Sequence, residues 1–138
     1  MTILIAGCGF VGERAADLLH AAGHTVIGLT HSAASTERLR AAKPWRVEAC
    51  DVSSETSVRE LAAKIAPQPV DAFIHCASSS RGGAETYQTV YVDGMRHLTS
   101  AFPAAFPLYT SSTSVYPQVD AETVDETSFA DPDRKSVV

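Results

Sequence analysis

The first 23 residues constrain the fold of this chain more than any other stretch. An apolar run, Ile3–Ala6, predicts a short buried strand, and residues 7–12 follow it as GCGFVG, with the spacing G-x-G-x-x-G. A helical pattern comes next, and Gly23 stands where a C-terminal cap is expected. The apolar residues of that helix face are Ala15, Leu18, Leu19 and Ala22. Strand, glycine turn and helix in this order predict a βα unit that opens a parallel sheet.

The three glycines of the turn have different expected roles. Gly7 lets the chain turn sharply out of the strand, Gly9 leaves room for a pyrophosphate beside the backbone, and Gly12 lets the helix pack close to the strand. The N–H groups of the first helical turn, which includes Phe10 and Val11, point at the same place. We therefore predict a dinucleotide site here, the alternative being a tight turn without a ligand.

Composition and charge narrow the class of protein. With 138 residues, 45% hydrophobic and 20% charged, the chain is expected to form a soluble domain with a core of its own. A net charge of -5 without a basic patch argues against nucleic-acid binding. No apolar run approaches the length of a membrane span. Small molecules or proteins are the expected partners, a second copy of the chain in a homodimer included.

The cysteines indicate the compartment. Cys8, Cys50 and Cys76 are odd in number and far apart, and they show neither C-x-x-C nor Cys/His ligand spacing. This pattern predicts neither a disulfide framework nor a metal site, and it favours a reduced, cytoplasmic location.

Strands alternate with helices along most of the chain. Strands are predicted at residues 3–6, 25–30, 45–49, 70–77 and 106–110, and the later helices at 34–42, from 53 or 54 to 66, and at 84–102. This alternation predicts an α/β fold, a doubly wound parallel sheet of five strands in the order 3-2-1-4-5. A ligand is then expected at the carboxyl ends of strands 1 and 4. Residues 112–138 are polar and predicted to form a loop or tail outside the domain of residues 1–111.

The end of the second strand indicates which dinucleotide is preferred. A carboxylate commonly stands about 20 residues past the glycines, where it holds the ribose hydroxyls of NAD. This chain has Thr30, His31 and Ser32 at that place and Arg38 a little later, but no acid. A carboxylate would repel the 2′-phosphate of NADP, so its absence slightly favours NADP over NAD. The alternative is that these are solvated loop residues and that NAD is held by the backbone.

Two further strand ends supply predicted cofactor contacts. Asp51 closes the third strand, where its carboxylate is placed for the adenine amino group and Val52 for a backbone contact, although Asp51 also suits the start of the next turn. Ala77, Ser78 and Ser79 end the fourth strand beside the glycine turn, in reach of the cofactor ribose.

The segment after the fifth strand carries a family resemblance. Residues 109–116 read YTSSTSVY, and this element resembles the strand end of the extended and atypical short-chain dehydrogenase/reductases, the superfamily of the NAD(P)-dependent epimerases and dehydratases. The glycine turn, Asp51-Val52 and the helix Tyr91–Leu98 resemble that family too. The resemblance implies a Rossmann-type fold and hydride transfer on a sugar nucleotide or small carbonyl or hydroxyl compound. It makes Ser112 the catalytic serine, with Thr113 its neighbour.

The chain also departs from the family pattern. Tyr91 stands where many members have a structural asparagine, and the Tyr-x-x-x-Lys pair that donates the proton is missing, since Asp120 follows Tyr116 at the lysine position. The chain resembles the N-terminal half of a longer enzyme. The sequence thus leaves open whether the chain as given is an enzyme. We expect no turnover at ordinary rates, and the alternative function is a non-catalytic NAD(P)-binding or sensor module that regulates a partner.

Overall fold

A computed structural model describes residues 1–79, 84–111, 116–117 and 123–130 of the chain. Its centre is a parallel sheet of five strands in the order β3-β2-β1-β4-β5, which confirms the predicted order. The strands are β1 (Thr2–Ala6), β2 (Thr25–Thr30), β3 (Arg46–Ala49), β4 (Ala72–His75) and β5 (Phe106–Tyr109). Strands β3, β4 and β5 are shorter than predicted, because their outer residues belong to the connecting loops.

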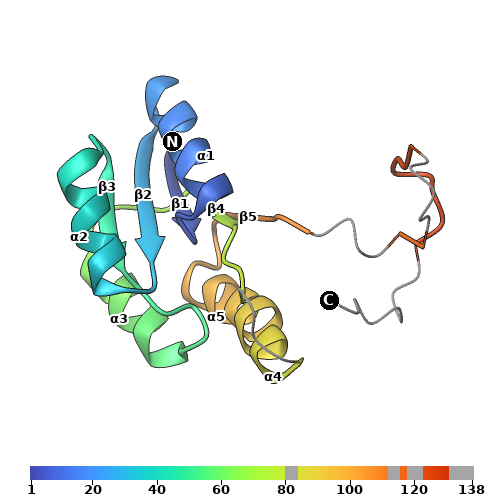
Figure 1. Cartoon of the computed structure of the whole chain (residues 1–138). Helices are drawn as coiled ribbons and strands as arrows, with labels where there is room; N and C mark the ends of the chain where they lie inside the picture. Colours follow the sequence, from blue (N-terminus) through green and yellow to red (C-terminus); the bar gives the residue numbers. More distant parts are fainter. Residues whose placement is uncertain (80–83, 112–115, 118–122, 131–138) are drawn as a thin grey trace.

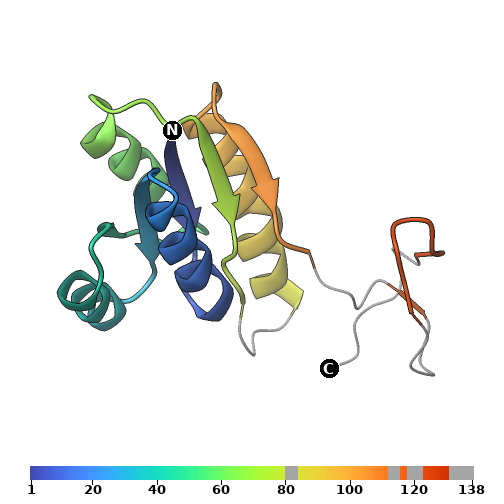
Figure 2. The same cartoon turned by 90° about the horizontal axis from the view of Figure 1, so that it is seen from above.

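Helices cover both faces of the sheet (Figures 1 and 2). The first face carries α1 (Phe10–Ala21) and α2 (Ala33–Ala42), and the second carries α3 (Glu55–Ile65) and α5 (Gly94–Ala101). A short helix, α4 (Ala84–Tyr87), and a π-helical segment, η1 (Gln88–Asp93), lead into α5. Strands are added on both sides of β1 through right-handed crossover connections. The helices of one direction therefore lie on one face of the sheet, and those of the other direction lie on the opposite face.

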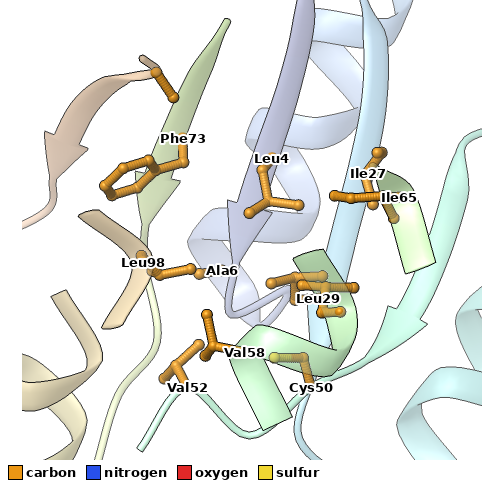
Figure 3. Packing of buried hydrophobic residues seen from close by; sticks show 12 residues of the cluster. Leu4, Ala6, Ile27, Leu29, Cys50, Val52, Val58, Ile65, Phe73 and Leu98 are labelled. Carbon is orange, nitrogen blue, oxygen red and sulfur yellow. The ribbon is translucent and has the colours of Figure 1, made fainter. Parts of the chain in front are cut away.

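The core follows from the alternation of side chains along β1, whose five residues are all buried. Leu4 and Ala6 point to the second face, where they pack with Phe73 of β4, Leu98 of α5 and residues of α3 (Figure 3). Ile3 and Ile5 point to the first face, into a second cluster with residues of α1, α2 and β3. A strand buried on both faces needs a continuous apolar run, and the first strand has one.

Helix α1 ends as predicted but buries a different stripe. Gly23 has φ +88, and its N–H donates to the His20 carbonyl while the His24 N–H donates to Leu19, the two hydrogen bonds of a Schellman motif. The helix buries Gly12 and Ala16. Leu18, predicted to face the core, is 54% exposed, so that part of the prediction is wrong. The buried stripe begins at Gly12 because this residue packs directly onto the glycine turn.

The predicted single helix over residues 84–102 is divided into α4, η1 and α5. The π-helical turn of η1 lies over His75, the last residue of β4, whose imidazole is completely buried. His75 Nε2 donates a hydrogen bond to the Val90 carbonyl oxygen at 3.0 Å. A side chain from the sheet thus provides a donor for a carbonyl group of the π turn. Sequence periodicity did not predict this, because the cause is a contact 15 residues away.

The described residues beyond β5 form no regular element; at 123–130 the Asp125 carboxylate accepts hydrogen bonds from Thr127 and Ser128. The predicted catalytic residues Ser112 and Thr113 lie outside the described residues, and the domain boundary at residue 111 stays a prediction. Among the described helices none has the length and apolar character that crossing a bilayer requires. Within the same ranges, no three His, Cys, Asp or Glu side chains gather as metal ligands.

Candidate functional site

A pocket of about 710 Å³ opens where the carboxyl ends of β1, β2, β3 and β4 meet. Every predicted cofactor residue except Gly12 lines it. These residues are Gly7, Gly9, Phe10, Val11, Thr30, His31, Ser32, Asp51, Val52, Ala77, Ser78 and Ser79. The sequence analysis missed Ser35 of α2 and Thr86, Thr89 and Val90 of the α4–η1 segment, because their approach to the pocket depends on how the helices pack.

The glycine turn is built as the sequence predicts. Gly7 has φ +96, and a Cβ there would lie 2.4 Å from backbone atoms of Ala77, so only glycine fits beside β4. A Cβ on Gly12 would lie 2.1 Å from the Gly7 carbonyl oxygen. A Cβ on Gly9 would meet nothing within 4 Å. Gly7 and Gly12 are therefore required by packing, whereas Gly9 faces open space in the pocket.

The start of α1 fits a phosphate group. Gly9 is the N-cap of the helix and contributes no side-chain hydrogen bond, so the first-turn N–H groups are not capped from within. The N–H groups of Gly7 and Cys8 both donate to the Leu29 carbonyl of β2, at 3.2 and 2.9 Å, which fixes the turn against the sheet. A rigid turn with exposed donors at the positive end of a helix dipole suits a pyrophosphate.

The end of β2 lines the pocket with three polar residues, Thr30, His31 and Ser32. Thr30 is buried, and its Oγ1 lies 2.6 Å from that of Thr36, so its hydroxyl is engaged inside the fold. Ser32 is the N-cap of α2, and its Oγ accepts from the Ser35 N–H at 3.2 Å. The His31 side chain is 79% exposed. Arg38, the later base in the sequence, forms an ion pair with Glu13 instead.

Of the two roles that the sequence suggested for Asp51, the structure shows the start of the turn into α3. Its Oδ1 accepts from the N–H and the hydroxyl of Ser53 at 3.0 and 2.7 Å, an Asx turn that leads toward α3. Its Oδ2 lies 3.5 Å from His31 Nε2 at the pocket wall. The adenine contact of Asp51 stays a prediction. The carbonyl of its neighbour Val52 is 3.0 Å from His97 Nδ1, which ties this corner to α5.

The segment after β4 is held by a residue that the sequence analysis did not place in the site. Tyr91 of η1 accepts a hydrogen bond from the Ser79 N–H at 3.2 Å, and its hydroxyl donates to Ser78 Oγ at 3.4 Å. The sequence contained one indication of this role, since Tyr91 stands where many members of the family have a structural asparagine.

The three cysteines also line the pocket. Burial raises the pKa of Cys8 to about 12, and burial raises the pKa values of Cys50 and Cys76 as well. Their thiols are therefore protonated at neutral pH, which makes them poor nucleophiles. They act as apolar wall rather than as reacting groups.

A family model decides the classification of this fold and pocket. The model of the NAD dependent epimerase/dehydratase family matches residues 3–136. The chain belongs to this family. No sequence among the curated proteins matches it significantly.

Several solved structures have a similar fold. A putative epimerase from Burkholderia cenocepacia is 26% identical, with 95% of this chain and 43% of that chain covered and a TM-score of 0.68. The yeast methylglyoxal/isovaleraldehyde reductase complexed with NADPH is 22% identical over 84% of this chain and 39% of that one, with a TM-score of 0.69. A serine dehydrogenase complexed with NADP⁺ is 17% identical, covers 86% and 57%, and has a TM-score of 0.74. This chain thus spans between 39% and 57% of these proteins.

Proposed function

We propose that this epimerase/dehydratase family chain binds NAD(P) in the pocket at the glycine turn, with a slight preference for NADP. The observation that carries the proposal is Gly9, an N-cap glycine whose missing Cβ leaves open space although no packing requires a glycine there. The glycine therefore suits a ligand that approaches the backbone, and the uncapped start of α1 supplies donors for its phosphates.

The remaining residues give the dinucleotide a direction. We place the adenosine end toward Asp51 and the Ser32–Ser35 cap of α2, where a 2′-phosphate would meet the hydroxyls of both serines. Among the described residues that line the pocket, Asp51 is the one acid. The nicotinamide end lies toward Ala77 and Ser79, after β4. NADPH and NADP⁺ are the dinucleotides in two of the similar structures, which supports the NADP preference.

The proposed reaction class is hydride transfer to or from a small carbonyl or hydroxyl compound or a sugar nucleotide. When bound, the nicotinamide supplies or accepts the hydride. By its resemblance to the family, Ser112 holds the oxygen of the substrate. The pocket is lined in part by Cys8, Cys50 and Cys76, which make its wall more apolar. Their raised pKa values keep the thiols protonated, so they add no competing nucleophile.

Calorimetry with a variant at Gly9 tests this proposal. A Cβ on Gly9 would meet nothing within 4 Å, and the branched side chain of a valine there would fill the space proposed for the pyrophosphate. Gly9→Val is expected to keep its circular dichroism and thermal midpoint but to lose NADPH binding. Ala21→Val, which introduces the same valine side chain at an exposed position at the other end of α1, is the control and should bind as the unmodified protein does. Equal NADPH affinity of Gly9→Val and the control would refute the site.

A further inference from the structure

His75, the last residue of β4, connects the sheet to the wall of the pocket. Its side chain is completely buried, on the same face of β4 as Phe73 of the core. Nε2 makes the 3.0 Å hydrogen bond with the Val90 carbonyl oxygen, and Val90 lines the pocket. Thr86 and Thr89 of the same α4–η1 segment line it too. One buried imidazole therefore joins the end of a central strand to this wall.

The start of α5 packs closely on the same imidazole. A Cβ on Gly94 would lie 3.1 Å from His75 Nε2 and 3.3 Å from Val52 Cγ2, and Val52 lines the pocket after β3. The Tyr109 ring of β5 meets the imidazole edge-on, with 5.5 Å between the ring centroids. Gly94 thus brings the imidazole, α5 and the pocket residue Val52 together in one cluster.

The surroundings of His75 place its proton on Nε2. Burial lowers the pKa of the imidazole below its ordinary value of 6.5, and hydrogen bonds with backbone carbonyls oppose this only in part, so the ring is neutral at neutral pH. A carbonyl oxygen can only accept, so the hydrogen bond with Val90 needs the proton on Nε2. Nδ1 keeps a lone pair, and in the part of the chain that the structure describes this buried atom has no hydrogen-bond partner. The titrating groups that face the ring are the phenols of Tyr91 and Tyr109.

We propose that His75 is a positioning residue of the dinucleotide pocket, and that its Nε2–H holds the η1 wall where NADPH needs it. This inference rests on the proposed NAD(P) function. His75 does not line the pocket itself, so it acts through Val90. Without this donor, η1 is expected to relax toward a regular α-helix, because π-helical turns are rare. That change would rotate Thr89 and Val90 relative to the pocket.

The tautomer of His75 gives a test that needs no ligand. In protein labelled with ¹⁵N at histidine, long-range ¹H–¹⁵N spectra distinguish a protonated ring nitrogen from an unprotonated one. His75→Gln identifies the His75 signals among those of the five histidines. We expect a protonated Nε2 and an unprotonated Nδ1 at neutral pH. A proton on Nδ1, alone or together with one on Nε2, would overturn the assignment.

Calorimetry with NADPH tests the effect on the pocket. His75→Leu removes the donor but keeps a side chain of similar size, and we expect it to bind NADPH about tenfold more weakly, which is the scale of one net hydrogen bond. His75→Gln supplies an amide N–H at a similar reach and should recover most of that loss. Phe73→Leu loosens the core packing of the same strand (Figure 3) but removes no hydrogen bond to η1, so it should bind NADPH as the unmodified protein does.

The outcomes separate this role from the proposed function. Unchanged NADPH affinity in His75→Leu would show that His75 does not position the pocket, while NAD(P) binding stands. An equal loss in His75→Leu and Phe73→Leu, or no recovery in His75→Gln, would assign the effect to core packing and overturn the positioning role. If the unmodified protein does not bind NADPH, the proposed function fails, and this role fails with it. The tautomer test decides even if His75→Leu does not fold.

Discussion

Gly12 approaches Gly7 so closely that a Cβ on Gly12 would lie 2.1 Å from the Gly7 carbonyl oxygen. The first helix therefore begins in direct backbone contact with the turn that precedes it. Two of the three motif glycines serve this packing, and only Gly9 faces the pocket without steric need. The glycine motif thus divides into a structural part and a ligand-facing part, and substitutions can separate them.

Gly12→Ala is expected to destabilise the fold, because the added methyl group would force the helix away from the Gly7 carbonyl. Overpacking of this kind typically costs about 1–3 kcal/mol. Gly9→Ala places the same methyl group in open space and should change the free energy of unfolding much less. Urea unfolding of both variants measures the contrast. Equal destabilisation by the two alanines would contradict the division of roles.

Ser32→Asp is expected to shift the cofactor preference toward NADH. Aspartate is as good an N-cap as serine, so α2 should remain intact, while the new carboxylate would repel the 2′-phosphate of NADPH. We expect the ratio of NADPH to NADH affinity to fall by about tenfold, which corresponds to about 1.4 kcal/mol. Ser32→Asn keeps the cap without the charge and should keep the ratio. A ratio that Ser32→Asp leaves unchanged would place the 2′-phosphate elsewhere.

Thr30 is a poorer position for the same test, although the sequence alone suggests it. The Thr30 hydroxyl forms a hydrogen bond with the Thr36 hydroxyl, and Thr30 is only 5% exposed. Thr30→Asp would bury a charge, so lower stability would obscure any change in cofactor preference. A drop in the thermal midpoint of Thr30→Asp, without one in Ser32→Asp, is the expected pattern.

Glu48 should make the stability of the fold dependent on pH. Its side chain is 7% exposed and pairs with Arg40, Arg46 and Lys64 at 3.0, 2.9 and 2.6 Å. Burial raises the pKa of Glu48, but the hydrogen bonds and charges of Lys64 and Arg46 outweigh it and hold the pKa below 4.5. A lowered pKa in the folded state stabilises the fold above pH 4.5, and this contribution is lost as the pH falls through the folded-state value.

Glu48→Gln is therefore expected to lower the free energy of unfolding at neutral pH by roughly 1–3 kcal/mol, with the difference shrinking as the pH falls below 4.5. The cations around Glu48 are themselves partly exposed, which keeps the effect at the lower end of that range. Glu60→Gln, an exposed change on α3, is the control. A pH-independent loss in Glu48→Gln would show that packing rather than charge is responsible.

Particular residues show what the sequence could and could not predict. The bounds of β2 and the strand order followed from apolar runs and the crossover rule, because both depend on local patterns. The π turn over His75 did not, because it depends on a contact 15 residues along the chain. The exposure of Leu18 did not either, because the close contact of Gly12 with Gly7 sets which face of α1 is buried. The sequence placed most of the pocket wall through its strand ends. It did not predict the contact of Tyr91 with Ser79, because that contact depends on how η1 packs against the segment after β4.

Turnover by the chain as given is expected to be slow, because no Tyr-x-x-x-Lys pair stands within its 138 residues. Proton transfer by a well-matched group contributes about a hundred- to ten-thousand-fold to rate. A steady-state assay with NADPH and small carbonyl compounds should give rates lower than those of full-length relatives by about that factor. Any activity should disappear in Ser112→Ala. Activity that survives Ser112→Ala would require another residue to hold the substrate oxygen.

The most direct test of NAD(P) binding at the glycine turn is a map of backbone amide shifts during titration with NADPH. The account predicts saturable changes that are largest at Gly9, Phe10 and Val11, with further changes at Ser32 and Ser79. Saturable binding with unchanged Gly9–Val11 amides, or no binding at all, would contradict it.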